Sequence, residues 1–279
     1  MKNGYIPILL QAAMRLEEKI AILIGAGQGP GEGMGNGRAT VLRFAQEGAK
    51  VMAVDRDLAS AEETVAMVVR AGGDCVAFEA DVTKEATLAA AIGAAQQRWG
   101  RIDILHYNVG VSIAGGDAPL LEITEEAFDR ITAINLRGAI MACKHVIPIM
   151  RQQRAGAIIM ISSLAAVENY PTVAYKATKA AMVAFAQQVA IQSAEYGVRA
   201  NVILPGLMDT PMAVDMRARV SGKSRAQVAA ERDARVPLRR KMGTAWDVAN
   251  AALFLASDEA NFITGAALPV DGGAALNIG

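Results

Sequence analysis

The segment Lys19–Gly37, KIAILIGAGQGPGEGMGNG, decides the fold. Its first part is a short apolar run typical of a buried strand, and the run ends at Gly25. From there glycine occupies every odd position to Gly37, and a helical pattern begins near Arg38. Backbone N–H groups at the start of a helix, left uncovered by side chains, form a seat for phosphate groups. The segment therefore predicts a strand, a phosphate-binding loop and a helix; a flexible low-complexity loop is the alternative.

The spacing of these glycines is unusual. The dinucleotide fingerprint GxGxxG fails in every register, because it needs two glycines separated by an odd number of positions. The variant GxxxGxG fits in four registers, starting at Gly25, Gly27, Gly29 or Gly31. A P-loop is excluded because no Gly-Lys-Ser/Thr follows.

Apolar runs and helical stretches alternate along the whole chain. Predicted strands are Lys19–Gly25, Lys50–Asp55, Asp74–Ala80, Ile102–Asn108, Ala157–Ser162, Val198–Leu204 and Ala266–Val270. Predicted helices are Arg38–Glu47, Leu58–Ala71, Lys84–Trp99, Thr124–Met150, Tyr175–Tyr196 and Ala245–Ala256. The strands are apolar throughout, so helices must cover both faces of a parallel sheet.

A barrel of eight βα units is the main rival to an open sheet. We favour the open sheet because the glycine cluster follows the first strand, where such sheets bind nucleotides. The fold class is thus α/β, a Rossmann-type, doubly wound parallel sheet of about seven strands. We expect a single domain over residues 16–279, preceded by an N-terminal extension, 1–15. A signal peptide is disfavoured because the apolar stretch there is short and Pro7 interrupts it.

Composition narrows the function. The chain has 279 residues, with 28 basic and 28 acidic side chains, so no charge excess indicates nucleic acid or an anionic membrane as partner. No stretch approaches the roughly 20 apolar residues of a membrane span. Two cysteines and two histidines at wide spacings predict no metal site, and the unpaired Cys75 and Cys143 favour the cytoplasm.

Asp55 ends the second predicted strand, 18 residues after Gly37. A carboxylate there can accept hydrogen bonds from a ribose diol and would repel a 2′-phosphate. It predicts NAD in preference to NADP, a preference that the adjacent Arg56 could soften. The alternative is a solvated acid or helix cap.

Tyr175 and Lys179 lie four residues apart on one predicted helix and so share a face. A lysine cation about 4 Å from a phenol is worth roughly 4 kcal/mol at an effective dielectric of about 20. That would lower the phenol pKa by up to about 3 units and give an acid/base near neutral pH. Ser163 follows the fifth strand, at the sheet edge where open α/β sheets bind ligands.

Taken together, these motifs resemble the short-chain dehydrogenase/reductase family from Leu16 to Gly273. The matching pieces are the glycine loop, Asp81-Val82, Asn108-Val109-Gly110, Asn135-Leu-Arg-Gly138, Ser163, Tyr175-x-x-x-Lys179, Pro205-Gly206-x-x-x-Thr210 and Asp271-Gly272-Gly273. Each piece is weak alone, but their joint order is specific.

The resemblance implies four catalytic residues. Tyr175 would move the proton of the substrate oxygen, and Ser163 would hydrogen-bond that oxygen. Lys179 would lower the pKa of Tyr175 and hold the nicotinamide ribose. Asn135 would anchor a water that leads protons to solvent. Simpler alternatives are a helix-bending role for Asn135 and a strand-end turn for Ser163.

The resemblance also implies the cofactor contacts. Asp81 and Val82 would touch the adenine, and Asn108 and Gly110 would brace the central strand. The remaining contacts, besides Tyr175 and Lys179, would be Gly25, Gly35, Asn36, Gly37, Asp55, Pro205, Gly206 and Thr210.

The loop departs from the family pattern, being about six residues longer than usual. The distance of 11 from Gly37 to Gly48 matches the family. Gly35-Asn36-Gly37 therefore takes the place of the final GxG, and the insertion falls within 27–34. A longer loop is similar to that of enoyl-reductase relatives, but Asn108 and Ser163 argue against that branch.

The segment Gly206–Arg240 would form the lid over the substrate. Met208, Met212 and Met216 offer an adaptable apolar wall. Its basic residues, Arg217, Arg219, Lys223 and Arg225, favour a solvated helical face over a site for an anionic substrate.

The sequence thus predicts an NAD-dependent oxidoreductase that interconverts a small secondary alcohol and a ketone. The alternative is a non-catalytic nucleotide-sensing protein on the same fold. The family resemblance also implies a homo-oligomer, a tetramer or a dimer.

Overall fold

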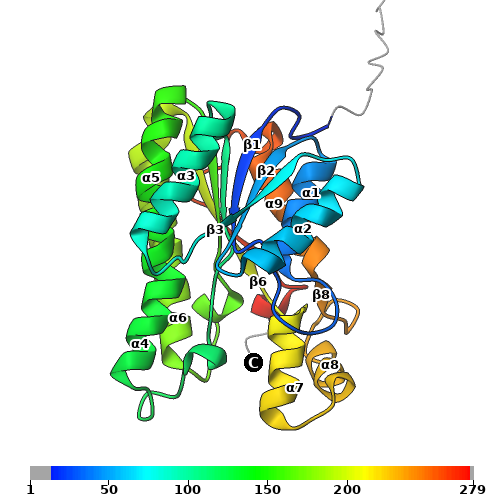
Figure 1. The fold of residues 1–279 in the computed structure, drawn as a ribbon. Coiled ribbons are helices and arrows are strands. Elements are labelled where there is room, and N and C mark those ends of the chain that lie inside the picture. Colours follow the sequence, from blue (N-terminus) through cyan, green and yellow to red (C-terminus); the bar gives the residue numbers. More distant parts are fainter. Residues whose placement is uncertain (1–13, 277–279) are drawn as a thin grey trace, which may run out of the picture.

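One parallel sheet of seven strands forms the centre of the protein (Figure 1). The computed structural model describes residues 14–276. The strand order is β3-β2-β1-β4-β5-β6-β9. The bounds are β1 Ile20–Ile24, β2 Lys50–Asp55, β3 Cys75–Glu79, β4 Ile104–Tyr107, β5 Gly156–Ile161, β6 Val198–Pro205 and β9 Ala267–Val270. The predicted open sheet is confirmed, and the barrel is excluded.

Helices cover both faces of the sheet (Figure 1). One layer holds α1 Asn36–Gln46, α2 Leu58–Arg70 and α9 Ala245–Ala256; the other holds α3 Glu85–Trp99, α5 Gly138–Gln153 and α6 Val173–Ser193. In β1, Ala21 and Leu23 join the core beneath the first layer, whereas Ile22 and Ile24 join the core beneath the second. Successive side chains of a strand point to opposite faces, so a sheet covered on both faces needs apolar residues at every position.

The long helix predicted over Thr124–Met150 is interrupted. The structure divides it into α4 Glu125–Thr132, a π-helical turn Ala133–Arg137 and α5. Thr124 is the N-cap and accepts a hydrogen bond from the Ala127 N–H (3.2 Å). The interruption lies at Asn135, whose side chain bonds to another segment of the chain. Single π turns of this kind are frequent at functional sites.

The predicted lid segment, Gly206–Arg240, lies between β6 and α9. It contains β7 Met208–Asp209, a π-helical turn Pro211–Asp215, α7 Met216–Ser221 and α8 Arg225–Asp233, and β8 Gly243–Thr244 follows it. Figure 1 shows α7 and α8 at the end of the sheet that also carries the glycine loop.

Residues 1–13, most of the predicted extension, lie outside the described part. Arg15 forms an ion pair with Glu259 (2.6 Å). No helix within residues 14–276 is long and apolar enough to span a membrane. Over the same range, no three His, Cys, Asp or Glu side chains gather as a metal site.

Candidate active site

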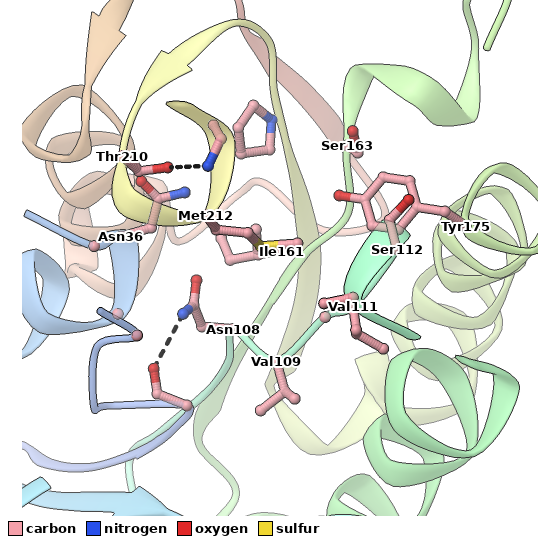
Figure 2. Close-up of a pocket in the computed structure, with 18 of the residues that line it drawn as sticks. Asn36, Asn108, Val109, Val111, Ser112, Ile161, Ser163, Tyr175, Thr210 and Met212 are labelled. Carbon is pink, nitrogen blue, oxygen red and sulfur yellow. Dashed lines mark hydrogen bonds between the residues drawn. The ribbon is translucent and has the colours of Figure 1, made fainter. Parts of the chain in front are cut away.

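A cavity of about 470 Å³ opens at the carboxyl edge of the sheet (Figure 2). The loops after β1, β2, β3, β4, β5 and β6 form its walls together with the lid. Every residue that the sequence predicts for the site lines this cavity except Asn135, which is fully buried.

The start of α1 packs directly against the first turn of the glycine loop. Gly35 is the N-cap, and α1 begins at Asn36, two residues earlier than expected. A Cβ on Gly37 would lie 1.9 Å from the Gly25 carbonyl oxygen, so only glycine fits there. The same oxygen accepts a hydrogen bond from Asn108 Nδ2 (3.0 Å; Figure 2). Gly35-Asn36-Gly37 therefore stands at the helix entry, as the spacing predicts.

The extra residues of the glycine loop form an ordered excursion that Gln28 closes. Gln28 Oε1 accepts from the Gly35 N–H (2.8 Å), and Gln28 Nε2 donates to the Gly33 carbonyl (3.1 Å). The Gly35 N–H is therefore already used by Gln28. The first N–H groups of α1 itself have no acceptor within the helix. An anion at this helix start would meet the amides of α1 itself.

The tip of the excursion reaches the lid. The Glu32 N–H donates to Asp215 Oδ1 (3.1 Å), and Arg219 contacts the Pro30 carbonyl (3.4 Å). A Cβ on Gly31 would lie 2.7 Å from the Asp215 carboxyl carbon, so the Gly31 backbone packs closely against the Asp215 side chain. Arg225 faces Asp215 (3.5 Å) and pairs with Asp209. The insertion therefore joins the predicted phosphate loop to the predicted substrate lid.

Asp55 is held at the end of β2 by backbone donors. It accepts from the N–H groups of Gly27 (2.8 Å) and Asp57 (3.1 Å). A carboxylate offers about four acceptor positions, so two remain for hydroxyl groups. Arg38, the basic residue that begins the predicted helix, pairs with Glu63 (2.9 Å).

Tyr175 stands in the third position of α6 and points into the cavity beside Ser163 (Figure 2). Burial raises the pKa of Tyr175 to about 12, while the Ser163 hydroxyl and the Arg217 guanidinium act to lower it. The expected lowering by Lys179 is not found, and desolvation is the largest influence on the Tyr175 pKa.

Lys179 is almost fully buried beneath Tyr175. Its Nζ donates to the carbonyl of Ile161 (2.8 Å) and lies 5.7 Å from the centre of the Tyr175 ring. A Cβ on Gly110 would lie 2.9 Å from this Nζ, which explains the glycine. Burial lowers the pKa of Lys179 to about 7. The sequence argument treats Lys179 as a cation, whereas in the structure its amine titrates near neutrality.

Asn135 fixes the loop after β4. Its Oδ1 accepts from the Val111 N–H (2.8 Å), and its Nδ2 donates to the Val111 carbonyl (3.0 Å) and to Thr178 Oγ1 (3.1 Å). Both amide donors are used, so the side chain retains one acceptor position.

Asp117 is a site residue that sequence reasoning missed. It is buried, and it accepts hydrogen bonds from the N–H groups of Ala174 (2.9 Å) and Tyr175 (3.1 Å). The hydroxyls of Ser112 and Thr172 also donate to it. Thr172, the N-cap of α6, makes no side-chain cap of its own. Asp117 thus caps the helix that carries Tyr175 across 58 positions of sequence, a distance at which no local pattern could reveal it.

The features of this cavity define an oxidoreductase that binds a dinucleotide. The predicted phosphate seat at α1, the predicted diol-binding acid Asp55 at the end of β2 and the Tyr175/Lys179/Ser163 group lie along one continuous cavity. Asn36 Oδ1, which lacks a hydrogen-bond partner among the described residues, also lines it.

Comparisons with known proteins agree. The family model described as "Enoyl-(Acyl carrier protein) reductase" matches residues 31–275. The chain is 36% identical to 2-(R)-hydroxypropyl-CoM dehydrogenase of Xanthobacter autotrophicus, over 91% of this chain and 97% of that enzyme. It is 31% identical to levodione reductase of Leifsonia aquatica, over 93% and 95% of the two chains. A solved Burkholderia xenovorans structure, assigned to the short-chain dehydrogenases/reductases, superposes with a TM-score of 0.88 at 41% identity and covers 95% of this chain and 99% of its own.

The chain belongs to the short-chain dehydrogenase/reductase family. It is an oxidoreductase of CH–OH groups that uses a nicotinamide cofactor. The catalytic interpretation of the sequence therefore prevails over nucleotide sensing.

Proposed function

We propose that the protein is an NAD-dependent enzyme that interconverts a secondary alcohol and a ketone, with Tyr175 as the acid/base. The observation that carries this proposal is the placement of the Tyr175 side chain, which enters the cavity beside Ser163 and above Lys179. NAD supplies a hydride acceptor or donor when it is bound.

The cofactor would lie along the cavity from Asp55 to Tyr175. The amides at the start of α1 would hold its phosphates, and Asp55 its adenosine ribose. Asp81 and Val82 would line the adenine site. Pro205, Gly206 and Thr210 would face the nicotinamide. These six residues and the start of α1 all line the same cavity.

Burial displaces the two pKa values in opposite directions, that of Tyr175 upward and that of Lys179 downward, so proton transfer from the Lys179 ammonium to a Tyr175 phenolate is favourable. A phenol with a pKa of about 12 is protonated at neutral pH and can donate to a ketone oxygen. An amine with a pKa of about 7 can return the proton, because it holds one for about half the time. Ser163 would orient the substrate oxygen, and the remaining acceptor position or the backbone of Asn135 would anchor the water that reaches solvent.

Tyr175→Phe tests this assignment. Loss of a general acid/base costs roughly 10²- to 10⁴-fold in rate, so we expect kcat to fall by about that factor with unchanged NADH affinity. Tyr170→Phe is the matched control, since its ring lies 5.5 Å from that of Tyr175 and the variant also loses one hydroxyl. Turnover of Tyr175→Phe within tenfold of the parent enzyme would overturn the assignment.

Preference for NAD over NADP is part of the proposal. It is supported by the two free acceptor positions of Asp55 and by the pairing of Arg38 with Glu63. Arg56 also lines the cavity and would moderate the preference. Thermal stabilisation by NADH and by NADPH distinguishes the two; greater stabilisation by NADPH would contradict the role of Asp55.

We also propose a homo-oligomer, tetramer or dimer, in the cytoplasm. Exposed apolar side chains on helices α4 and α6, Phe128 and Ile191, support an interface. The free, buried thiols of Cys75 and Cys143 fit a reducing compartment. Light scattering of the purified protein measures the assembly, and a monomer at micromolar concentration would refute it.

A further inference from the structure

Two guanidinium groups at the lid end of the cavity have no carboxylate partner among the residues that the structure describes. Arg232 of α8 is 8% exposed, and Arg217 of α7 is partly buried. Both line the active-site cavity, and both also line a smaller cavity beside it to which Arg235 contributes. Within residues 14–276, no carboxylate oxygen lies within 4.0 Å of Arg217 or Arg232.

The contacts of Arg232 are weak for a buried cation. Its Nε donates to Met242 Sδ (3.3 Å), and Nη2 reaches the Met208 carbonyl at 3.5 Å. Burial and the charges of Arg217 and Arg235 lower the pKa of Arg232 to about 10. Asp209 and Tyr170 act in the opposite direction. A buried charge is strongly unfavourable unless it is paired, so this arrangement is suited to bind an anion.

Of the other basic residues nearby, Arg219, Arg235, Arg239 and Arg240 are exposed to solvent. Three more have carboxylate partners. Arg225 pairs with Asp209, Lys223 with Glu231 (2.6 Å) and Lys241 with Asp233 (2.7 Å). Asp209, the acid whose charge acts on Arg232, is thus already paired with Arg225. The sequence expectation of a solvated face holds for exposed Arg219 and Lys223 and fails for Arg217, which faces the cavity.

Arg217 and Arg232 lie near Tyr175, the proposed acid/base, in the same cavity. Arg217 is close enough to lower the pKa of Tyr175, and the Tyr170 ring that contacts Tyr175 also acts on Arg232. Apolar Met208, Met212 and Met216 line the same wall. A ligand with its oxygen at Tyr175 would therefore find methionine side chains and both guanidinium groups within the same cavity.

We infer that the substrate is a hydroxy or oxo compound that carries an oxyanion, a carboxylate or a sulfonate, bound by Arg232 and Arg217. The inference rests on the proposed function, because it places the reacting carbonyl at Tyr175. The planar guanidinium fork of arginine matches such oxyanions with two parallel hydrogen bonds.

A pair of substrates that differ by one charge tests the inference. 4-Oxopentanoate and 4-oxopentanamide have nearly the same shape, and 3-oxobutane-1-sulfonate distinguishes the kind of oxyanion. With saturating NADH, we expect kcat/KM for at least one anion to exceed that for the amide tenfold or more, mainly through KM. Equal values, or a preference for the amide, would overturn the inference.

Arginine variants show which residues cause the preference for the anion. Arg232→Gln should reduce kcat/KM for the anion at least tenfold and that for the amide less than twofold, and Arg217→Gln should act in the same direction. Arg239→Gln is the matched control, since Arg239 is an exposed lid residue and the change removes the same charge. An unchanged anion preference in both Arg232→Gln and Arg217→Gln would refute the site, and circular dichroism verifies that the variants are folded.

Binding without turnover separates the two proposals. In Tyr175→Phe with bound NADH, quenching of the nucleotide fluorescence gives a Kd for each compound. Tighter binding of an anion that depends on Arg232 supports the site, even if no ketone oxidises NADH in the parent enzyme; in that case the proposed function alone fails. Anion binding no tighter than that of the amide refutes the site.

Discussion

Asp117 offers the sharpest test of how the fold positions Tyr175. Replacement by alanine leaves two backbone N–H groups of α6 without an acceptor inside the protein, at Ala174 and Tyr175. Hydrogen bonds to a charged group are worth about 1.5–3 kcal/mol each. The hydroxyls of Ser112 and Thr172 can rotate to other acceptors, so we count only the two amides. We expect Asp117→Ala to lower the free energy of unfolding by about 3 kcal/mol.

Thermal denaturation measures this loss. At this chain length 1 kcal/mol corresponds to roughly 2–4 °C, so the melting temperature should fall by about 6–12 °C. Because one lost bond is to Tyr175 itself, kcat should fall more than tenfold while the Kd for NADH changes little. Asp129→Ala, which removes an exposed acid from α4, is the control. A fall of under 3 °C with unchanged kcat would refute the capping role.

Three further predictions concern the loop and the core. Gly37→Ala should abolish NADH binding, since its Cβ would lie 1.9 Å from a backbone oxygen, whereas Gly29→Ala, with open space around it, should bind normally; calorimetry decides. Burial lowers the pKa of His106 to about 3. The neutral ring therefore contributes fully to the free energy of unfolding above pH 6.5, and this contribution is lost as the pH falls toward 3. His106→Leu should remove up to about 5 kcal/mol of this acid sensitivity in urea titrations, and an unchanged pH slope would contradict it. Asp215→Ala should free the loop tip, which speeds cleavage after Glu32 by a glutamate-specific protease; an unchanged rate would show that the contact does not hold the loop.

The sequence predicts the sheet well because burial on both faces leaves a strong local signal. β2 and α9 coincide with their predicted bounds, since apolar runs and turn residues delimit them. The π turn at Asn135 was missed because its cause is a bond to Val111, 24 residues away. The local pattern of apolar residues carries no information about a contact with so distant a residue.

The candidate site shows the same division. Spacing to Gly48 correctly places Gly35-Asn36-Gly37 at the helix entry, because steric contact with Gly25 demands a glycine at one position. The sequence could not distinguish Arg217 and Arg232, which face the cavity, from Arg219, which faces the loop. Which way a basic side chain points depends on how the lid helices pack.

Isotope transfer tests the central claim most directly. The parent enzyme is incubated with a ketone and NADH that carries deuterium at C4 in either configuration, and the alcohol is analysed by mass spectrometry and NMR. The account predicts one deuterium at the carbinol carbon from one of the two labelled forms, and none of this product with Tyr175→Phe on the same timescale. Alcohol without label from both forms, or equal labelling by Tyr175→Phe, would contradict it.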